Sequence, residues 1–447
     1  MRRFSAAEYV RACAAAAVVA PAFLARPYLA PDVYRAYQTR RIRRLLDRAW
    51  QAPFYRKQYA AAGVSPADFR NLDDLARFPT VTKSELIAAI HAGELGAVRG
   101  RGIDSVSSGS SGRVITVTHD VADTHAYAAG RFRILNMTGR LTPWSRTMYV
   151  YTSEFPARSY FGLYRSWFVP TIHDLDDTIL RLRELRPHVL CVYPSRLMEF
   201  AAVVDTRSAR AFGIQLISVN SETSSRSQRA ALADHFGCPV LEEYSTEELG
   251  WTAAECAFGT MHAWEDMAYL EILSPEADRA VAQGEVGEIV GTNLHNLATP
   301  FIRYRQGDNG SLRDVQCPCG RTFRALEHLV GRANDTFHFS SGDVSPAYLL
   351  DSIYSLLLDD RYPIADFCLI QRARDSVTLQ YSLAPSTTAT PELGRRVEES
   401  LASLLPASVR VTAEHTTCMY KTLSGKRNPI VSLVGHSPAP AVAAVDA

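Results

Sequence analysis

Residues Asp174–Ser195 read DLDDTILRLRELRPHVLCVYPS, and this stretch joins a helix-like pattern to a strand-like one. The apolar residues of 174–185 recur at helical spacing, whereas 188–195 is a short apolar run that ends at a proline and a serine. The same alternation surrounds it, with strand-like runs at 146–153, 214–222 and 238–245 and a helix-like run at 226–237. This pattern predicts an α/β fold with doubly wound, mostly parallel sheets.

The chain has 447 residues, which is long for one domain. The pattern of predicted helices and strands changes twice along it. From about Met267 short strand-like runs alternate with turn signals, and we expect a small β-barrel-like subdomain there. After Gly331 a strand pair lies between helix-like runs, one of them around 347–358, which predicts a small, mobile α+β domain. The predicted division is a large domain at 1–331 with a helical extension at 1–34, a small domain at 332–435 and a disordered tail at 436–447.

The charge balance excludes a general nucleic-acid-binding surface. Lys and Arg number 48 against 47 Asp and Glu, so the formal net charge is +1 and there is no basic excess.

The apolar run from Ala12 to Leu24 is shorter than the about 20 residues of a membrane span. Glu8 and Arg11 lie where a signal peptide turns apolar, so we expect a packed or membrane-surface helix instead. A cytoplasmic protein with 8 reduced cysteines is the expectation.

Five short motifs carry candidate chemistry, and each one also has an ordinary interpretation. SSGSSG at 107–112 offers backbone N–H groups and hydroxyls to a phosphate, but a serine-rich linker or turn has the same composition. EEYSTEELG at 242–250 follows a predicted strand. Its Tyr244 is suited to stack on a flat ring and its Glu248 to hold a metal ion, unless the segment is a solvated acidic loop.

The remaining three motifs lie further along the chain. Asp308 of FIRYRQGDNGSL is suited to accept hydrogen bonds from a ribose diol, although GDNG also fits a hairpin turn. GRANDTF, which contains Arg332 and Asp335, lies at the predicted domain junction. LSGK brings Lys426 to a turn near the C-terminus, where a lysine either meets an anion or remains solvated.

The order of the five motifs resembles that of the adenylate-forming (acyl-CoA synthetase/ligase) superfamily, and within it the phenylacetate–CoA ligase and CapK-like branch. APFYRKQYAAAGV, FRNLDDLARFPTVTKSEL, LRPHVLCVYPSRL and ATPFIRYRQGD add to the resemblance, which covers 35–435. It implies that ATP and a carboxylate form an acyl adenylate and pyrophosphate. A nucleophile, often the thiol of CoA, then displaces AMP.

The resemblance also implies a role for each motif residue. The residues that would bind the nucleotide are Ser107, Ser108, Gly109, Ser110, Ser111 and Gly112 at the phosphates, Ser221, Glu222 and Tyr244 at adenine, and Asp308 and Arg332 at the ribose. Glu248 would bind Mg²⁺, and Lys426 would reach the carboxylate and the α-phosphate. The small domain would rotate about Arg332–Asp335, so that one arrangement inserts Lys426 and the other admits the acceptor.

Two departures from the family pattern leave the substrate and the acceptor open. Val114 replaces the proline that usually follows the phosphate loop, and Ser245 replaces a common glycine. Three functions fit the sequence. The protein transfers the acyl group to the thiol of CoA or of a carrier protein, it transfers the acyl group to an amine, or it is an inactive nucleotide-binding homologue. Tyr149, Tyr151, Phe155, Tyr160 and Phe161 either line an aryl pocket or belong to the core. Either a monomer or a homodimer fits the sequence.

A metal site is also predicted. Cys256 and His262 lie in one segment, and Cys317 and Cys319 lie in another as CPC. Three thiolates and one imidazole suit tetrahedral zinc, although the spacing is not that of a standard zinc finger and ordinary reduced thiols are the alternative. Members of the resembling branch carry similar sets, some of which bind zinc, and this favours a structural Zn²⁺.

Overall fold

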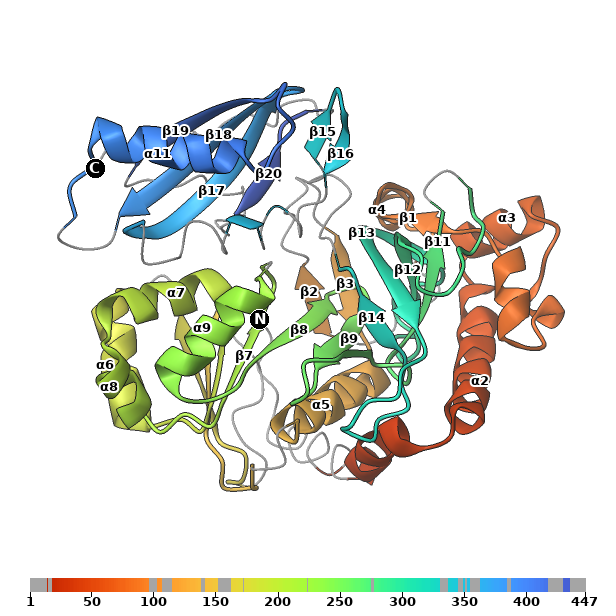
Figure 1. The fold of residues 1–447 in the computed structure, drawn as a ribbon. Coiled ribbons are helices and arrows are strands. Elements are labelled where there is room, and N and C mark those ends of the chain that lie inside the picture. Colours follow the sequence, from red (N-terminus) through yellow and green to blue (C-terminus); the bar gives the residue numbers. More distant parts are fainter. Residues whose placement is uncertain are drawn as a thin grey trace.

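The computed structural model describes residues 14, 18–95, 103–106, 115–137, 141–151, 162–171, 173–222, 224–274, 277–329, 337–344, 349, 352–353, 362–383, 387–416 and 429–434 (Figure 1). Its helices are α2 (Pro31–Ala49), α3 (Pro53–Ala61), α4 (Lys83–His91), α5 (Val121–Leu135), α6 (Leu175–Leu185), α7 (Pro194–Val203), α8 (Thr206–Ala211), α9 (Arg226–Phe236) and α11 (Pro391–Ala402). Short 3₁₀ helices are η1 (Arg26–Tyr28), η2 (Pro66–Asp68) and η3 (Leu72–Arg77). Within the described residues no helix has both the length and the apolar character needed to cross a bilayer.

The strands of the N-terminal part are β1 (Val81–Thr82), β2 (Ile103–Val106), β3 (Thr116–His119), β4 (Thr147–Tyr151), β5 (Ser166–Pro170), β6 (Val189–Val192), β7 (Leu216–Asn220), β8 (Val240–Thr246), β9 (Gly250–Glu255), β10 (Met261–Ala263), β11 (Ala268–Leu273), β12 (Gly287–Asn293), β13 (Tyr304–Arg313) and β14 (Ala325–Glu327). Those of the C-terminal part are β15 (Phe337–Phe339), β16 (Gly342–Val344), β17 (Ile364–Ala373), β18 (Ser376–Leu383), β19 (Arg410–His415) and β20 (Ile430–Ser432).

One mixed sheet organises the N-terminal part. In the described residues its order is β11-β12-β13-β14-β10-β9-β8-β7-β6-β4-β5, with β1 paired to β13. The strands from β5 to β8 pair in parallel, as the alternating helix and strand patterns predicted. On its other edge β8 pairs antiparallel with β9, and the antiparallel strands continue the same sheet. The α/β fold class is therefore confirmed.

Helices cover both faces of the parallel strands. Leu182 of α6, Phe200 of α7 and Leu232 of α9 pack with Val150 and Val219 in one aliphatic cluster. Two of these helices start where the sequence supplies a cap or a proline: the side chain of Ser225 accepts the N–H of Gln228 at α9, and α7 begins with a proline. On the opposite face lies α5, whose Arg131 guanidinium is 5.1 Å from the ring centroid of Tyr149.

A capping box begins α4. Thr82 Oγ1 accepts the N–H of Glu85, and the Glu85 carboxylate accepts the N–H of Thr82 at 2.8 Å. Strand β1 directly precedes this helix and pairs in parallel with β13, with Val81 opposite Tyr304. The start of α4 is thus fixed beside the first residues of β13.

The hairpin interpretation of GDNG is wrong. Gly307, Asp308 and Asn309 lie inside the continuous strand β13, which pairs with β12 and β14. Gly307 has φ +82°, and the β12–β13 register shifts nearby, between Glu288 and Val290. The local glycine therefore makes an irregularity within a strand instead of a chain reversal.

The C-terminal part has sheets and an apolar cluster of its own, at the top of the view in Figure 1. A sheet of order β19-β18-β17-β20 packs against α11 through Leu393, Val397 and Leu401. The β15–β16 hairpin adds Phe337 to the same cluster. The predicted domain boundary at 331–332 and most of the predicted helix at 347–358 fall outside the described residues, so the domain division stays a prediction.

A buried ion pair ties the N-terminal segment to this fold. The guanidinium of Arg133 in α5 lies 2.9 and 2.8 Å from the two carboxylate oxygens of Asp266, and both side chains are almost fully buried. Arg133 also donates to the backbone carbonyl of Phe23, whose ring is buried. The segment around Phe23 is therefore part of the packed structure, as expected for a packed N-terminal helix.

Two helical glycines should respond to alanine with opposite signs. A Cβ on Gly130 in α5 would lie 2.5 Å from Trp251 Cδ1, whereas one on Gly394 in α11 would meet only Tyr381 Oη at 3.7 Å. We expect Gly130→Ala to lower the free energy of unfolding by about 1–3 kcal/mol because of this overlap. Gly394→Ala should raise it by up to about 1 kcal/mol because alanine favours the helix. Urea denaturation of both variants tests this, and a stabilised Gly130→Ala protein would contradict the packing described.

Candidate functional site

Two hydrogen bonds cross between the end of β8 and strand β13. The phenol of Tyr244 donates to Asp308 Oδ2 at 2.6 Å, and the phenol of Tyr304 donates to Glu248 Oε1 at 3.1 Å. Each segment thus supplies one tyrosine and one carboxylate, and each tyrosine binds the other segment's acid. Of the residues predicted from the motifs, Tyr244 thus contacts Asp308, 64 positions away, and Glu248 contacts Tyr304 of the strand that carries Asp308.

Lys83 joins this group from the start of α4. Its Nζ lies 3.4 Å from Glu248 Oε1, and the side chain of Glu248 is 8% exposed. The pairing of β1 with β13 explains the position, because it places Lys83 next to the strand that carries Tyr304. Sequence analysis did not identify Lys83 or Tyr304 as functional, although both lie inside stretches that supported the resemblance, TVTKSEL and FIRYRQGD.

Ser221 and Glu222 lie directly after β7, at the edge where the parallel strands end. Ser221 has φ +67°, a left-handed conformation that turns the chain sharply. Glu222 Oε2 accepts the N–H of Ser195, in the first turn of α7, at 3.0 Å. A carboxylate at this position interacts favourably with the positive end of the helix dipole. Glu222 therefore links the β7 end to the neighbouring helix.

The rest of the predicted nucleotide site lies outside the described residues. This applies to Ser107, Ser108, Gly109, Ser110, Ser111 and Gly112, to Arg332 and Asp335, and to Lys426. Their roles stay predictions. Of the predicted aromatic set, Phe155, Tyr160 and Phe161 also lie outside, whereas Tyr149 and Tyr151 are buried, 6% and 7% exposed.

Two adjacent carboxyl groups on β8, the partly buried Glu242 and the buried Glu243, have different surroundings. Burial raises the pKa of Glu242 to about 7, although the Arg229 guanidinium, 2.9 Å away, opposes that shift. Burial raises the pKa of Glu243 to about 8, and hydrogen bonds with Ser245, Ser218 and Asn220 oppose it only partly. Side chains alternate along a strand, so Glu242 faces α9 and Glu243 faces the opposite side of the sheet.

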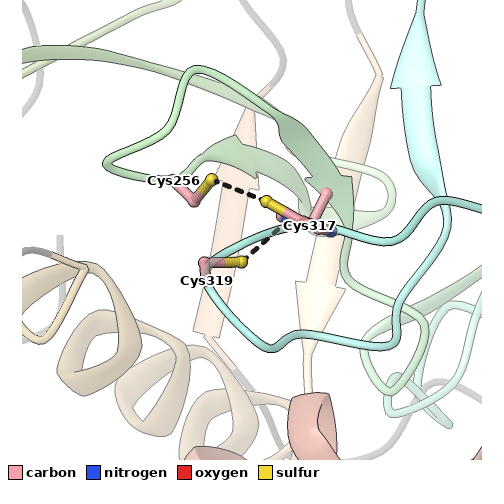
Figure 2. Close-up of side chains that lie close together, drawn as sticks. Cys256, Cys317 and Cys319 are labelled. Atoms are coloured by element: carbon pink, nitrogen blue, oxygen red, sulfur yellow. Dashed lines mark hydrogen bonds between the residues drawn. The ribbon is translucent and has the colours of Figure 1, made fainter.

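The predicted metal ligands come together. Cys256 follows β9, His262 lies in β10, and Cys317 and Cys319 lie between β13 and β14. Their ligand atoms are all within 4.8 Å of one another. Cys256 Sγ is 3.6 Å from Cys317 Sγ, and Cys319 Sγ is 3.3 Å from His262 Nε2; Figure 2 shows the three cysteine side chains pointing toward one another. The antiparallel pairing of β9 with β10 and of β10 with β14 produces this arrangement.

The outer contacts of the cluster also suit a metal. The Nδ1 atom of His262 is 2.9 Å from the carbonyl oxygen of Phe323, so this nitrogen carries the proton and Nε2 presents its lone pair to the sulfurs. Burial raises the pKa of the Cys317 thiol, but hydrogen bonds with Thr260 and the Cys319 backbone outweigh it and lower the pKa to about 6. The donor set, its spacing and the oriented imidazole fit a tetrahedral ion.

The raised pKa of Glu243 predicts a pH-dependent stability. Its folded-state pKa of about 8 exceeds the ordinary value of 4.5, so unfolding releases a proton between these pH values and stability falls as the pH rises. Glu243→Gln cannot ionise and should become more stable than the parent protein as pH rises from 5 to 8, by on the order of 2–4 kcal/mol. Urea denaturation at several pH values measures this difference, and a constant difference would show that Glu243 is already ionised in the folded state.

No family model matches the chain, but comparisons with known proteins find similar sequences and similar folds. A phenylacetate-coenzyme A ligase of Escherichia coli is 28% identical over 353 residues, which cover 72% of this chain and 76% of that protein. The ligase of the same name from Thermus thermophilus is 26% identical over 331 residues, 70% and 73% of the two chains. The fold matches the crystal structure of 2-hydroxyisobutyryl-CoA ligase in the postadenylation state, with a TM-score of 0.75, 21% identity and 91% of each chain covered. The chain is thus similar in sequence to phenylacetate-coenzyme A ligases over more than two thirds of its length, and it has the fold of a CoA ligase.

Proposed function

We propose that this chain catalyses the ATP-dependent ligation of a carboxylic acid to the thiol of CoA through an acyl-adenylate intermediate. The observation that carries this proposal is the crossed pair of hydrogen bonds, Tyr244 to Asp308 and Tyr304 to Glu248, which holds two nucleotide motifs against each other. Four curated relatives named phenylacetate-coenzyme A ligase, 25% to 28% identical, support the reaction class. The acid itself is not assigned by these names.

In the first step an oxygen of the substrate carboxylate forms a bond to the α-phosphorus of ATP, and the bond to the pyrophosphate oxygen breaks. Both reactants are anions, so their repulsion must be offset by nearby positive charge. Mg²⁺ supplies part of that charge when bound, and Glu248 is the residue that would hold it. Tyr304 and Lys83 fix the orientation of this carboxylate. In the second step the thiol sulfur attacks the acyl carbon, and AMP leaves.

The remaining roles are part of the proposal. Asp308 would bind the ribose hydroxyls with Arg332, and the loop at 107–112 would bind the phosphates. A division into domains at 1–331 and 332–435 would let Lys426 approach for adenylation and withdraw for thioester formation.

Lys426 provides the direct test of adenylation. Lys426→Ala should lower acid-dependent pyrophosphate release by about 100-fold or more, because a positive charge at the reacting phosphate is lost. Lys421→Ala, in the same segment of the chain, is the matched control and should stay near the parent rate. Pyrophosphate exchange into ATP, measured with a panel of carboxylic acids, is the assay. A Lys426→Ala protein that exchanges pyrophosphate as fast as the parent would refute the proposed role.

The acceptor is decided by a second assay on the parent protein. Each acid that supports pyrophosphate release is incubated with ATP and, in separate reactions, CoA, a phosphopantetheinylated carrier protein and primary amines. We expect a thioester of CoA as the product, identified by mass spectrometry. Formation of an amide in place of a thioester would instead make the protein an amide ligase.

We propose that Cys256, His262, Cys317 and Cys319 hold a structural zinc ion. All four positions of a tetrahedral ion would then be filled by protein atoms, so the metal would stabilise the loops without taking part in the reaction. Purified protein should contain about one zinc ion per chain. Cys319→Ala should lose the metal and lower the melting temperature by more than about 5 °C.

Cys238→Ala is the control for this prediction, because Cys238 is a buried free thiol outside the cluster. It should keep the parent metal content, measured by elemental mass spectrometry. Equal zinc content in the Cys319→Ala and Cys238→Ala proteins would exclude the site.

A further inference from the structure

The two faces of the parallel strands are chemically unlike. The face toward α6, α7, α8 and α9 is aliphatic, and its strand residues are Met148, Val150, Leu190, Val192, Ile217, Val219 and Val240. The opposite face, at the same strand ends, has phenols, a thiol, a hydroxyl, an amide and a carboxylate from Tyr149, Tyr151, Cys191, Ser218, Asn220 and Glu243. Filling a core does not require such groups, and burying them is unfavourable unless each is hydrogen-bonded.

Glu243 is the centre of this polar face. Its carboxylate accepts hydrogen bonds from Ser245 Oγ at 3.1 Å and from Ser218 Oγ and Asn220 Nδ2 at 3.3 Å. Asn220 Nδ2 also donates to the phenol oxygen of Tyr151 at 2.7 Å. Among the described residues, the hydrogen-bond partners of Glu243 are neutral, and Glu243 is 5% exposed.

The neighbouring Glu242 shows what a purely structural carboxylate looks like in this strand. It pairs with Arg229, which also binds Glu255 at 2.7 Å, so its charge is compensated. Among the described residues Glu243 has weaker hydrogen bonds to neutral groups, two of them at 3.3 Å. A carboxyl group keeps acceptor capacity on its oxygens even when it is protonated, so Glu243 can still accept a hydrogen bond from a better donor.

The polar face lies next to residues of the motifs that are proposed to bind the nucleotide. Tyr151 and Asn220 are the last residues of β4 and β7, and Glu243 is in register with Asn220. Ligands of open α/β sheets bind outside these carboxyl ends. Ser221 follows Asn220 at the end of β7, and Tyr244 follows Glu243 in β8. Tyr244 is hydrogen-bonded to Asp308. The polar face therefore adjoins the proposed adenylation site.

The rings on this face suit a flat substrate. The ring centroid of Tyr151 is 5.9 Å from that of Tyr149 and 5.0 Å from that of Tyr193, and both pairs are tilted. Aromatic side chains at such spacing offer apolar edges and faces to another ring. This face thus combines aromatic rings that can flank a substrate ring with the Glu243 carboxyl group, which can accept a further hydrogen bond.

We propose that Glu243 selects the acid substrate, which is an aromatic carboxylic acid whose ring carries a hydroxyl or amino group that donates a hydrogen bond to the Glu243 carboxylate. Asn220 and Tyr151 position this carboxylate, and the tyrosines flank the ring. The inference rests on the proposed function, since it assigns the substrate class of the same ligase.

The test compares ring-substituted phenylacetates that differ only in the donor. Hydroxy, amino and methoxy isomers are assayed in the ortho, meta and para positions by pyrophosphate release, and kcat/KM is measured for each. The parent protein should prefer the best hydroxy or amino acid over its methoxy counterpart by at least about 10-fold, as expected for a site built to pair with a donor. Glu243→Leu should reduce this ratio to within about 3-fold, and Glu243→Gln should give an intermediate ratio.

Glu242→Gln is the matched control, because it changes the adjacent carboxylate on the other face and should preserve the parent ratio. The melting temperature of each variant shows whether it is folded, so that a change in substrate preference is distinguished from unfolding. A folded Glu243→Leu or Glu243→Gln protein with the parent ratio would overturn the inference while leaving the ligase assignment intact. If no acid drives pyrophosphate release, the proposed function is wrong. In that case, the affinities of the same acids for the parent and Glu243→Gln proteins are measured by calorimetry. They still show whether Glu243 discriminates between hydroxy or amino acids and their methoxy counterparts.

Discussion

Strand β8 is the constraint on which the site depends, because its two edges pair in opposite senses. It is parallel to β7 on one side and antiparallel to β9 on the other. This single strand therefore joins the helix-covered parallel layer to the antiparallel strands that carry the cysteine and histidine cluster. It ends at the edge formed by the carboxyl ends of the parallel strands, which is where open sheets bind ligands.

Alternation along β8 gives three consecutive residues three environments. Glu242 faces α9 and an arginine, Glu243 faces the tyrosine-lined side, and Tyr244 reaches Asp308. A shift of register by one residue would exchange the first two environments and place the less compensated carboxylate next to the arginine. The neighbouring strands β7 and β9 hold this register, so they contribute to the site although few of their residues belong to it.

The proposed nucleotide site contains two carboxylates, those of Glu248 and Asp308, which the fold holds through hydrogen bonds and an ion pair. Glu248 is balanced by Lys83 and a phenol, and Asp308 by another phenol. Buried anions of this kind are stable only when paired or hydrogen-bonded. A triphosphate would add further negative charge, which explains in physical terms why such a site needs Mg²⁺ and the lysine and arginine of the proposed mobile domain.

Much of the fold was predictable because the periodicity of apolar residues is a local property. The strands β4, β6, β7 and β8, the helices α6 and α9 and the Thr82–Glu85 capping box follow from short stretches of sequence. The pattern GDNG misled because a glycine–aspartate pair is compatible with both a turn and an irregular strand, and pairing with β12 and β14 selects the strand. Lys83 and Tyr304 escaped notice because nothing local distinguishes a lysine at a helix start or a tyrosine in a strand.

By itself the sequence determined the α/β class, the order of the nucleotide motifs and the four candidate metal ligands, since each depends on residue types at short spacing. Only the tertiary structure decided that Glu248 meets Lys83 and Tyr304, that Asp308 meets Tyr244, and that Glu243 lies among neutral donors on the tyrosine-lined face. These contacts join segments far apart in the chain, and their geometry is set by strand pairing and register. Neither can be read from one segment alone.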